Sequence, residues 1–280
     1  VEQAADKWRA VGVEPGIILA RHKTSDSPHQ IASVQTLARR ALPHADILLI
    51  DEAHRSMAPS VRKIAEQYPT RIGVTATPCR EDGKGLKALY DCIIEPIPMK
   101  DLIEQGWLAR YRLYAPTTPD LSRVKKIAGD YAPSGAVESM RHLAGHVVAG
   151  YQQHLADKTA LLFAVTRDHS RALAQEFRDA GIAAAHCDGD TDKAERKQAL
   201  RDLSSGALKV LCNVDLFGYG TDVPSLDGML ECRPTQSLTV WRQHCGRALR
   251  PKPSAAILLA FAGNVNRGLG LPDDPVAWSL

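Results

Sequence analysis

Short apolar runs that alternate with longer amphipathic stretches constrain this chain most. Each run holds three to six residues, is apolar almost throughout, and is bounded by polar residues or glycine. Such runs are typical of strands buried on both faces of a parallel sheet, and the stretches between them are long enough for crossover helices. The sequence therefore predicts an α/β fold. The runs cover residues 16–20, 47–50, 72–75, 160–165, 183–186, 210–214, 229–231 and 256–261.

Two of the intervening stretches carry recognisable helix ends. Asp168 is placed to cap one helix, and Gly181 is placed to end it. The next helix is expected to begin near Thr191 or Asp192, where Glu195 can close a capping box on Asp192. Repeated strand–helix–strand units of this kind favour parallel sheets.

The length of 280 residues suits two domains of about 150 residues each. The composition changes between residues 115 and 134, where three prolines, a glycine and a lysine pair interrupt the periodicity. We therefore predict a first lobe at residues 1–115, a linker at 116–135, a second lobe at 136–265 and a carboxyl-terminal extension at 266–280.

Charge and composition exclude several classes of protein. Lysine and arginine number 35 against 32 acidic residues, a net charge of +3. This balance excludes binding of nucleic acid by bulk charge alone but leaves room for a local basic groove. No apolar run approaches the roughly 18 residues of a membrane helix, so no membrane association is expected. The six cysteines form no CxxC pair, which disfavours a zinc site and fits a cytoplasmic protein.

Two adjacent carboxylates, Asp51 and Glu52, follow the apolar run at 47–50. The carboxyl ends of parallel strands form the ligand crevice of such sheets. Asp51 can hold Mg²⁺ there, directly or through water, and Glu52 can orient and deprotonate a water that attacks a γ-phosphate. Taken alone, the pair can equally be two solvated carboxylates that cap the next helix.

Two hydroxyls follow the run at 72–75, where Thr75 and Thr77 flank a small residue and Pro78 prevents the strand from continuing. These hydroxyls can form hydrogen bonds across the crevice to His54 or its neighbours. The alternative is a simple Ser/Thr turn at a strand end.

A third motif runs from Gln243 to Arg250. Arg247 and Arg250 lie three positions apart, so on a helix they would project from the same side. Two guanidinium groups on one face suit a polyphosphate. The alternative is a solvated basic helix face.

These motifs, with a GxDxP segment at 220–224 between the second and third, resemble those of the superfamily 2 helicases and translocases. The DEAH, TAT, GxDxP and QxxGRxxR forms are all present, and the resemblance covers nearly the whole chain. Residues 217–224, 233–235 and 262–264 are most similar to the bacterial and phage DEAD/DEAH-box proteins of the RadD type. The resemblance implies two RecA-like lobes with parallel sheets, ATP in the cleft between them, and a motor that moves on nucleic acid. DNA is the favoured partner, and RNA stays open as an alternative.

The resemblance also implies a role for each matched residue. Asp51 and Glu52 match the Mg²⁺ ligand and the water-activating base, and Arg247 and Arg250 match the arginine fingers. The other nucleotide-binding and coupling positions are His54, Thr75, Thr77, Gly220, Asp222 and Gln243. The matched nucleic-acid contacts are Gln35, Thr36, Thr166 and Gly189.

One motif of the family is missing from the sequence. No GxxxxGK[ST] phosphate loop occurs in the 280 residues, and the Gly83-Lys84-Gly85 segment lacks a flanking strand. In the family this loop lies upstream of the DEAH strand. We therefore expect a truncated amino end, an incomplete first lobe, and a fragment that does not hydrolyse ATP by itself.

Two other functions stay open. The chain can be a nucleic-acid-binding remnant that does not hydrolyse ATP. It can also be the motor part of a larger restriction or repair nuclease, with a nuclease domain downstream of Leu280 or on a partner protein.

Overall fold

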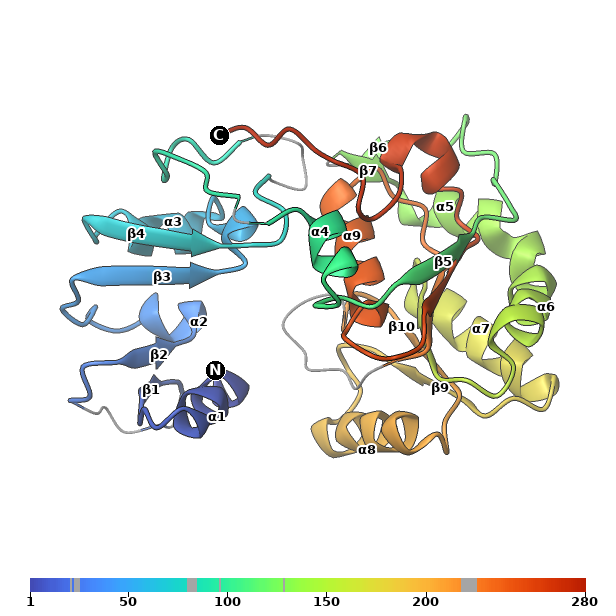
Figure 1. Ribbon diagram of the computed structural model, residues 1–280, viewed down its shortest axis with the longest axis horizontal. Coiled ribbons are helices and arrows are strands. Elements are labelled where there is room, and N and C mark those ends of the chain that lie inside the picture. The colour runs from blue at the N-terminus through green and yellow to red at the C-terminus, as the bar shows by residue number, and fades with distance from the viewer. Residues whose placement is uncertain (21, 23–25, 80–84, 96, 128, 218–225) are drawn as a thin grey trace. The chain divides into compact units, whose positions relative to one another are not determined.

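The computed structural model describes the chain except for residues 21, 23–25, 80–84, 96, 128 and 218–225. The chain divides into two compact units (Figure 1). Of the described residues, 1–79, 85–93 and 278–280 form the first unit, and 94–277 form the second. Each unit is described by itself below.

A parallel sheet forms the centre of the second unit. Within the described residues it has six strands in the order β5-β12-β11-β8-β10-β9, and every neighbouring pair is parallel. All residues of β8, β10, β11 and β12 are buried, which confirms the prediction of strands buried on both faces. The strands are β5 (Tyr111–Tyr114), β8 (Ala160–Phe163), β9 (Ala184–Cys187), β10 (Val210–Asn213), β11 (Gly228–Glu231) and β12 (Ala256–Ala260).

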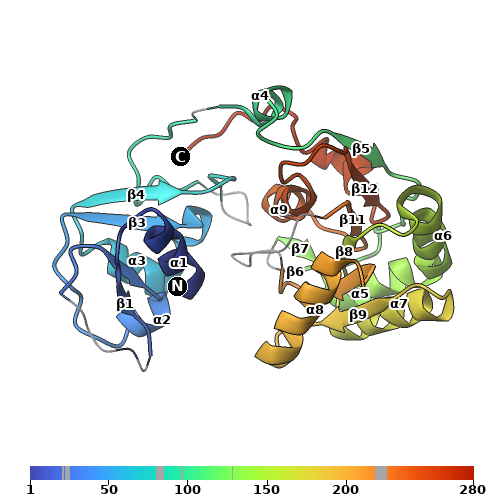
Figure 2. The same cartoon turned by 60° about the horizontal axis from the view of Figure 1, so that its bottom comes forward.

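Helices cover both faces of this sheet (Figures 1 and 2). Successive side chains of a strand point to opposite faces. Leu162 of β8 accordingly packs in one core cluster with Phe177, and its neighbour Leu161 packs in the other cluster with Trp241. The first face carries α5 (Pro133–Met140), the 3-10 turn η2 (Arg141–Leu143), α6 (Ala144–Leu155) and α7 (Arg167–Asp179). The second face carries α8 (Lys193–Ser205) and α9 (Leu238–Ala248).

The ends of α7 and α8 show one wrong and one confirmed prediction. Thr166, not Asp168, caps α7, because the Thr166 Oγ1 accepts a hydrogen bond of 3.2 Å from the His169 backbone N–H. Asp168 falls in the first helical turn, where a carboxylate favours the helix dipole instead. Asp192 caps α8 as predicted, with its Oδ1 2.7 Å from the Ala194 backbone nitrogen.

The first unit contains two parallel strand pairs among its described residues. In the second pair, Ile47 lies opposite Thr70 and Asp51 lies opposite Val74. The strands are β1 (Gly16–Ile18), β2 (Gln30–Ala32), β3 (Ile47–Asp51) and β4 (Thr70–Val74). The helices are α1 (Glu2–Ala10), α2 (Val34–Leu37), the 3-10 turn η1 (Ala53–Arg55) and α3 (Pro59–Ala65).

The prediction that both faces of β3 and β4 are buried is wrong. Leu48 packs on a cluster that includes Leu37 of α2 and Ile64 of α3, so one face is covered. The side chains of the other face are open to solvent, although they are equally apolar. They are Ile47 (56% exposed), Leu49 (60%), Ile72 (46%) and Val74 (50%).

The predicted domain limits also differ from the structure. Residues 94–115 were expected in the first lobe, but β5 pairs with β12 as an edge strand of the second unit. The expected linker at 116–135 is likewise packed on the second unit. It forms a hairpin of β6 (Lys126–Ile127) and β7 (Asp130–Tyr131), and the Asp130 carboxylate accepts hydrogen bonds from Thr235 Oγ1 at 2.7 Å and the Gln236 backbone N–H at 2.8 Å.

The remaining short elements of the second unit lie near its two chain limits. These are α4 (Met99–Glu104) and η3 (Val265–Leu269). The expected extension at 266–280 begins inside η3, and its residues up to 277 belong to the second unit, where Tyr111 of β5 donates a hydrogen bond to Asp273. A strand's side chain thus holds this segment in place.

Candidate functional site

A sharp turn separates the two neighbouring carboxylates at the end of β3. Asp51 is the exposed last residue of the strand, and its Oδ1 accepts a hydrogen bond of 2.9 Å from the Glu52 backbone N–H. Glu52 has a left-handed backbone (φ 54°, ψ 49°), which few residues other than glycine adopt. Strained backbone of this kind persists where the surrounding structure enforces it, often at functional turns. The turn gives the two carboxylates different surroundings.

His54 links the end of β3 to the end of β4. Its side chain is fully buried, with Nδ1 3.4 Å from Glu52 Oε2 and 3.0 Å from Thr75 Oγ1. The predicted hydrogen bond between His54 and this hydroxyl is therefore present. Thr75 Oγ1 also lies 3.1 Å from the Thr77 carbonyl oxygen, so this hydroxyl bridges the histidine and the turn that follows β4.

The Ser/Thr turn considered as an alternative is present as well. The Thr77 backbone N–H donates to Thr75 Oγ1 at 3.1 Å, which closes the turn. The Thr77 side chain is buried, and its Oγ1 has no hydrogen-bond partner within the described part of the chain. The two interpretations thus coexist, because the same hydroxyl closes the turn and bonds His54.

Gly73 of β4 is a residue that the sequence analysis missed. A Cβ at this position would lie 2.7 Å from the Ala53 Cβ and 2.7 Å from the Tyr90 ring. Only glycine therefore allows η1, which carries His54, to lie this close to β4. A single glycine between the apolar Ile72 and Val74 was the available signal.

The first unit offers a suitable carboxylate for a divalent cation. Among the residues that the structure describes, no three His, Cys, Asp or Glu side chains form a metal-binding group. Mg²⁺ in nucleotide sites usually takes only one or two carboxylates, together with phosphates and waters. Asp51 is exposed at the carboxyl end of a strand, so its position fits such a ligand.

The predicted nucleic-acid contacts of the first unit differ in exposure. Gln35 is exposed on α2. Thr36 is buried, and its Oγ1 accepts a hydrogen bond of 2.8 Å from Ser33 Oγ, the N-cap of α2. Gln35 is therefore available for direct contact, whereas Thr36 contributes to the helix cap.

The predicted contacts of the second unit lie at the carboxyl ends of β8 and β9. Thr166 caps α7, and Gly189 is exposed in the turn before α8. A Cβ on Gly189 would lie 3.8 Å from Arg167 Nη2, so the residue after Thr166 reaches this turn. Burial lowers the pKa of the nearby His169 to about 4. This histidine is therefore neutral, and its Nδ1 accepts a hydrogen bond of 3.3 Å from the Val165 backbone N–H.

The third motif begins on α9 and ends beyond it. Gln243 and Arg247 lie on the helix and are half-buried, but the helix ends at Ala248 and Arg250 follows it. The prediction that Arg247 and Arg250 share a helix face is therefore wrong. The physical reason is Pro251, because a residue that precedes proline disfavours helical backbone. Gly220 and Asp222 of the GxDxP segment lie outside the described residues.

A buried ionisable pair under α9 was also missed. Glu231 and His244 are 0% and 2% exposed, and their Oε2 and Nδ1 atoms are 2.7 Å apart. The His244 ring stacks on Phe163 of β8, with centroids 3.6 Å apart. The pair fixes the helix that carries Gln243 and Arg247 to two strands of the sheet. The available signal in the sequence was the position of His244 inside the third motif.

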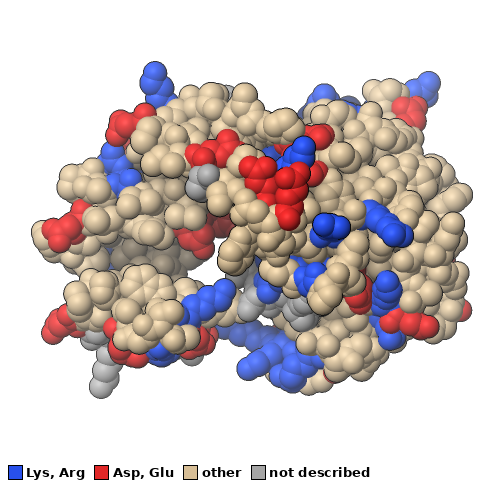
Figure 3. Space-filling model, in the orientation of Figure 1, with Lys and Arg blue, Asp and Glu red and all other residues tan. Residues whose placement is uncertain are grey.

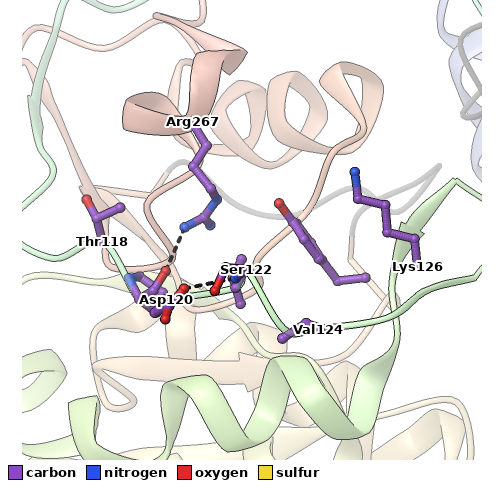
Figure 4. A pocket seen from close by; sticks show the side chains of 9 residues that line it. Thr118, Asp120, Ser122, Val124, Lys126 and Arg267 are labelled. Carbon is purple, nitrogen blue, oxygen red and sulfur yellow. Dashed lines mark hydrogen bonds between the residues drawn. The ribbon is translucent and has the colours of Figure 1, made fainter.

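A cavity of about 580 Å³ lies elsewhere in the second unit (Figure 4). Arg267 donates a hydrogen bond of 3.1 Å to the Pro119 carbonyl, and Asp120 accepts one of 2.9 Å from the Ser122 backbone N–H. This backbone bond lowers the pKa of Asp120. None of the predicted site residues lines this cavity. The cavity is lined by Thr118, Pro119, Asp120, Leu121, Ser122, Val124, Lys126, Tyr131 and Arg267.

Comparison with known families decides the identity. Residues 139–252 match the helicase conserved C-terminal domain, and residues 1–80 match the res subunit of type III restriction enzymes. A 51.5 kDa protein of Lactococcus phage (isolate 7-9) is 36% identical over 236 residues, which are 83% of this chain and 52% of the phage protein. The Saccharomyces cerevisiae protein named ATP-dependent helicase IRC3 is 32% identical over 243 residues, 80% of this chain and 35% of that protein.

This chain belongs to the superfamily 2 helicases. It spans 52% and 35% of the lengths of these two relatives. A solved fragment of an HsdR subunit of a type I restriction enzyme from Vibrio vulnificus shares the fold, with a TM-score of 0.71 and 18% identity over 96% of this chain and 54% of that one. The α/β architecture of this chain is therefore RecA-like. Its described residues include no helix with the length and hydropathy to cross a bilayer.

Proposed function

We propose that this superfamily 2 helicase is the motor of an ATP-dependent helicase or translocase that acts on DNA. The hydrogen bond between His54 and Thr75 carries the proposal, because it joins the DEAH turn to the TAT turn. A change at Glu52 can pass through His54 to the end of β4. The matches to a helicase domain and to a restriction subunit support a DNA motor.

The chemistry that we propose divides among four side chains. Asp51 would hold Mg²⁺ with ATP, and the bound metal would neutralise the charge that develops on the transferred phosphate. Glu52 would orient and deprotonate the attacking water. Arg247 and Arg250 would stabilise the same phosphate charge with their guanidinium groups. Gln243, Gly220 and Asp222 are proposed nucleotide or coupling contacts, as the family motifs imply.

Nucleic acid is the proposed partner, with DNA preferred over RNA. Gln35 of the first unit, and Thr166 and Gly189 of the second, are the proposed contacts, because each is accessible or borders an accessible turn. Motor proteins of this kind contact the backbone rather than the bases. Binding should therefore depend on salt and little on base sequence.

The test uses the longest open reading frame that contains these residues. Glu52→Gln keeps the side-chain shape and removes the base, so we expect DNA-stimulated ATP hydrolysis to fall about 10²-fold or more. Nucleotide binding should stay within a few-fold. Glu66→Gln is the matched control, since Glu66 is half-exposed and pairs with Arg62 at the surface.

Two outcomes of this experiment would contradict the proposal. Hydrolysis by Glu52→Gln within a few-fold of wild type would remove the role of Glu52. Absence of ATP hydrolysis in the wild-type product would favour the non-hydrolysing nucleic-acid-binding protein instead.

A second candidate is the motor part of a larger restriction or repair nuclease. The match of residues 1–80 to a type III restriction subunit and the fold shared with an HsdR fragment favour it. Cleavage of plasmid DNA by the same gene product, alone or with a partner protein and dependent on ATP and Mg²⁺, would support this candidate. Intact plasmid in an assay with active ATP hydrolysis would count against it.

A further inference from the structure

A buried carboxylate organises the turn between β9 and α8. The Asp188 side chain is only 3% exposed. Its Oδ2 accepts hydrogen bonds from His186 Nε2 at 3.0 Å and from Arg171 Nη2 at 3.1 Å. Its Oδ1 accepts hydrogen bonds from the backbone N–H groups of Asp190 at 2.9 Å and Thr191 at 3.1 Å. Every oxygen of this carboxylate is thus engaged within the protein.

The charge of Asp188 is fixed. Burial opposes ionisation, but the hydrogen bonds from His186 and from the Asp190 backbone N–H outweigh it and lower the pKa of Asp188 to about 2. The group is therefore an anion throughout the physiological pH range.

Two arginines of α7 lie against this anion with part of each guanidinium in solvent. Arg167 Nε is 3.6 Å from Asp188 Oδ2, and the side chains of Arg167 and Arg171 are 49% and 55% exposed. Nη1 of Arg167 also pairs with the exposed Asp190 carboxylate, and Nη1 of Arg171 donates to the exposed Asp168 carboxylate at 3.2 Å. A guanidinium has five donors, so a phosphate in solvent can compete with these exposed carboxylates while Asp188 keeps its contact. The carboxylate thus holds two half-exposed cationic groups in place before a ligand arrives. Because these side chains are already ordered, less conformational entropy is lost when a ligand binds them.

A third arginine closes the same turn from the other side. Arg196 of α8 donates hydrogen bonds to the Thr191 carbonyl at 3.0 Å and the Asp188 carbonyl at 3.3 Å. Lysine and arginine side chains gather where α8 lies (Figure 3). Gly189 is exposed in the turn before α8, and a Cβ on it would lie 3.8 Å from Arg167 Nη2.

We propose that Asp188 is a positioning residue for nucleic-acid binding, which holds Arg167 and Arg171 beside the Gly189 turn so that they receive backbone phosphates. The inference rests on the proposed function, since it assumes that the Gly189 turn contacts nucleic acid. A negative charge by itself repels phosphate. Asp188 therefore favours binding only through the arrangement of the arginines. Removal of its charge weakens binding if the arrangement matters, and tightens binding if only the charge matters.

The experiment measures binding of a fluorescent single-stranded DNA, and of an RNA of the same sequence, to the 280-residue chain at several salt concentrations. Asp188→Asn should lower the affinity about tenfold or more. Loss of two phosphate contacts should also flatten the plot of log K against log salt by about 0.7 per contact. If Asp188→Asn acted only by making the net charge of the chain more positive, the affinity for nucleic acid would rise instead.

Asp168→Asn is the matched control. Asp168 lies on the same helix and also pairs with Arg171, but its side chain is 96% exposed. Removal of this exposed charge should leave binding unchanged or tighten it. The contrast separates the position of the carboxylate from its charge.

A second variant covers the case in which Asp188→Asn fails to fold, as judged by circular dichroism. Arg167→Ala with Arg171→Ala changes two half-exposed side chains, and it should weaken binding and flatten the salt dependence to the same extent. Added to a folded Asp188→Asn chain, the two arginine changes should weaken binding little further, because they act through the same contact.

The outcomes separate the inference from the proposed function. Unchanged or tighter binding by Asp188→Asn, or by the double arginine variant, would overturn the inference while wild-type binding still supports the motor. No binding of either nucleic acid by the wild-type chain would overturn both the inference and the proposed contacts.

Discussion

At the scale of single residues, the candidate site of the first unit depends on one histidine. His54 Nδ1 forms a hydrogen bond of 3.0 Å with Thr75 Oγ1, which also bonds the Thr77 carbonyl. Glu52 Oε2 lies 3.4 Å from the same nitrogen. Protonation or ligand binding at Glu52 therefore changes the electrostatic environment of a hydrogen bond that ends on β4. This is a physical route from the carboxylates to the second strand.

Arg247 and Arg250 give the first residue-scale prediction. In the gene product that hydrolyses ATP, alanine at either position should lower the ATPase rate by roughly 10³-fold, the scale of arginine fingers. Lysine should not restore the rate, because it lacks the planar fork of donors. Steady-state phosphate release measures the effect, with Arg62→Ala as a surface control. A variant that keeps DNA-stimulated hydrolysis would show that the changed arginine takes no part in catalysis.

His244 gives a prediction about stability. His244→Ala leaves Oε2 of Glu231, whose side chain is 0% exposed, without its hydrogen bond to Nδ1 of the histidine. A buried polar group left without its partner costs about 1–3 kcal/mol of unfolding free energy. Urea unfolding of the chain measures the loss, and Glu231→Gln in the same background should recover part of it. His142→Ala, at an exposed position, should change the stability by about 0.5 kcal/mol or less. Equal stability of His244→Ala and wild type would mean that the pair does not fix α9.

At the scale of elements, the interior strands of the second unit are predictable from sequence. Continuous apolar runs located β8, β10, β11 and β12 because both of their faces are covered. The edge strand β5 and the short β2 were missed, since each mixes polar and apolar residues. An apolar run does not indicate whether another helix or strand packs on each face of the strand. The open face of β3 and β4 was therefore not predictable from the sequence.

The candidate site shows the same division. The hydrogen bond of His54 to Thr75 was predictable because parallel strands end at one edge of a sheet. The contacts of Asp188 and the pair of Glu231 with His244 were not, because they join different elements and follow no local pattern. Arg250 lies beyond the end of α9 because Pro251 follows it and disfavours helical backbone at Arg250.

The open face of β3 and β4 gives a prediction at the scale of elements. Leu49 is 60% exposed, so Leu49→Thr should change the unfolding free energy by about 0.5 kcal/mol or less. It should also reduce self-association of the chain, because it interrupts an exposed apolar patch. Leu48→Ala, on the packed face, should instead cost about 1–2 kcal/mol. Light scattering and urea unfolding measure both effects. A large loss of stability in Leu49→Thr would show that this face is covered.

At the scale of the whole molecule, the proposed chemistry is divided between the two units. The carboxylates, His54 and the TAT hydroxyls belong to the first unit, and the arginines of the third motif belong to the second. Phosphoryl transfer needs metal and arginine charges together. Neither unit alone carries the full set, so hydrolysis can respond to a change in how the units are engaged with nucleic acid.

The last prediction concerns ATP hydrolysis by the 280-residue chain itself. Its sequence contains no GxxxxGK[ST] motif, so it lacks the backbone N–H cradle and the lysine that hold the β- and γ-phosphates in this class of enzyme. Asp51, Glu52 and the arginines would then have no phosphate held in position, and turnover should be absent even with saturating single-stranded DNA. The background is set by the Glu52→Gln variant of the same chain, and phosphate release from the two proteins should be equal. Release by the wild-type chain that clearly exceeds this background would mean that another segment of these residues holds the phosphates.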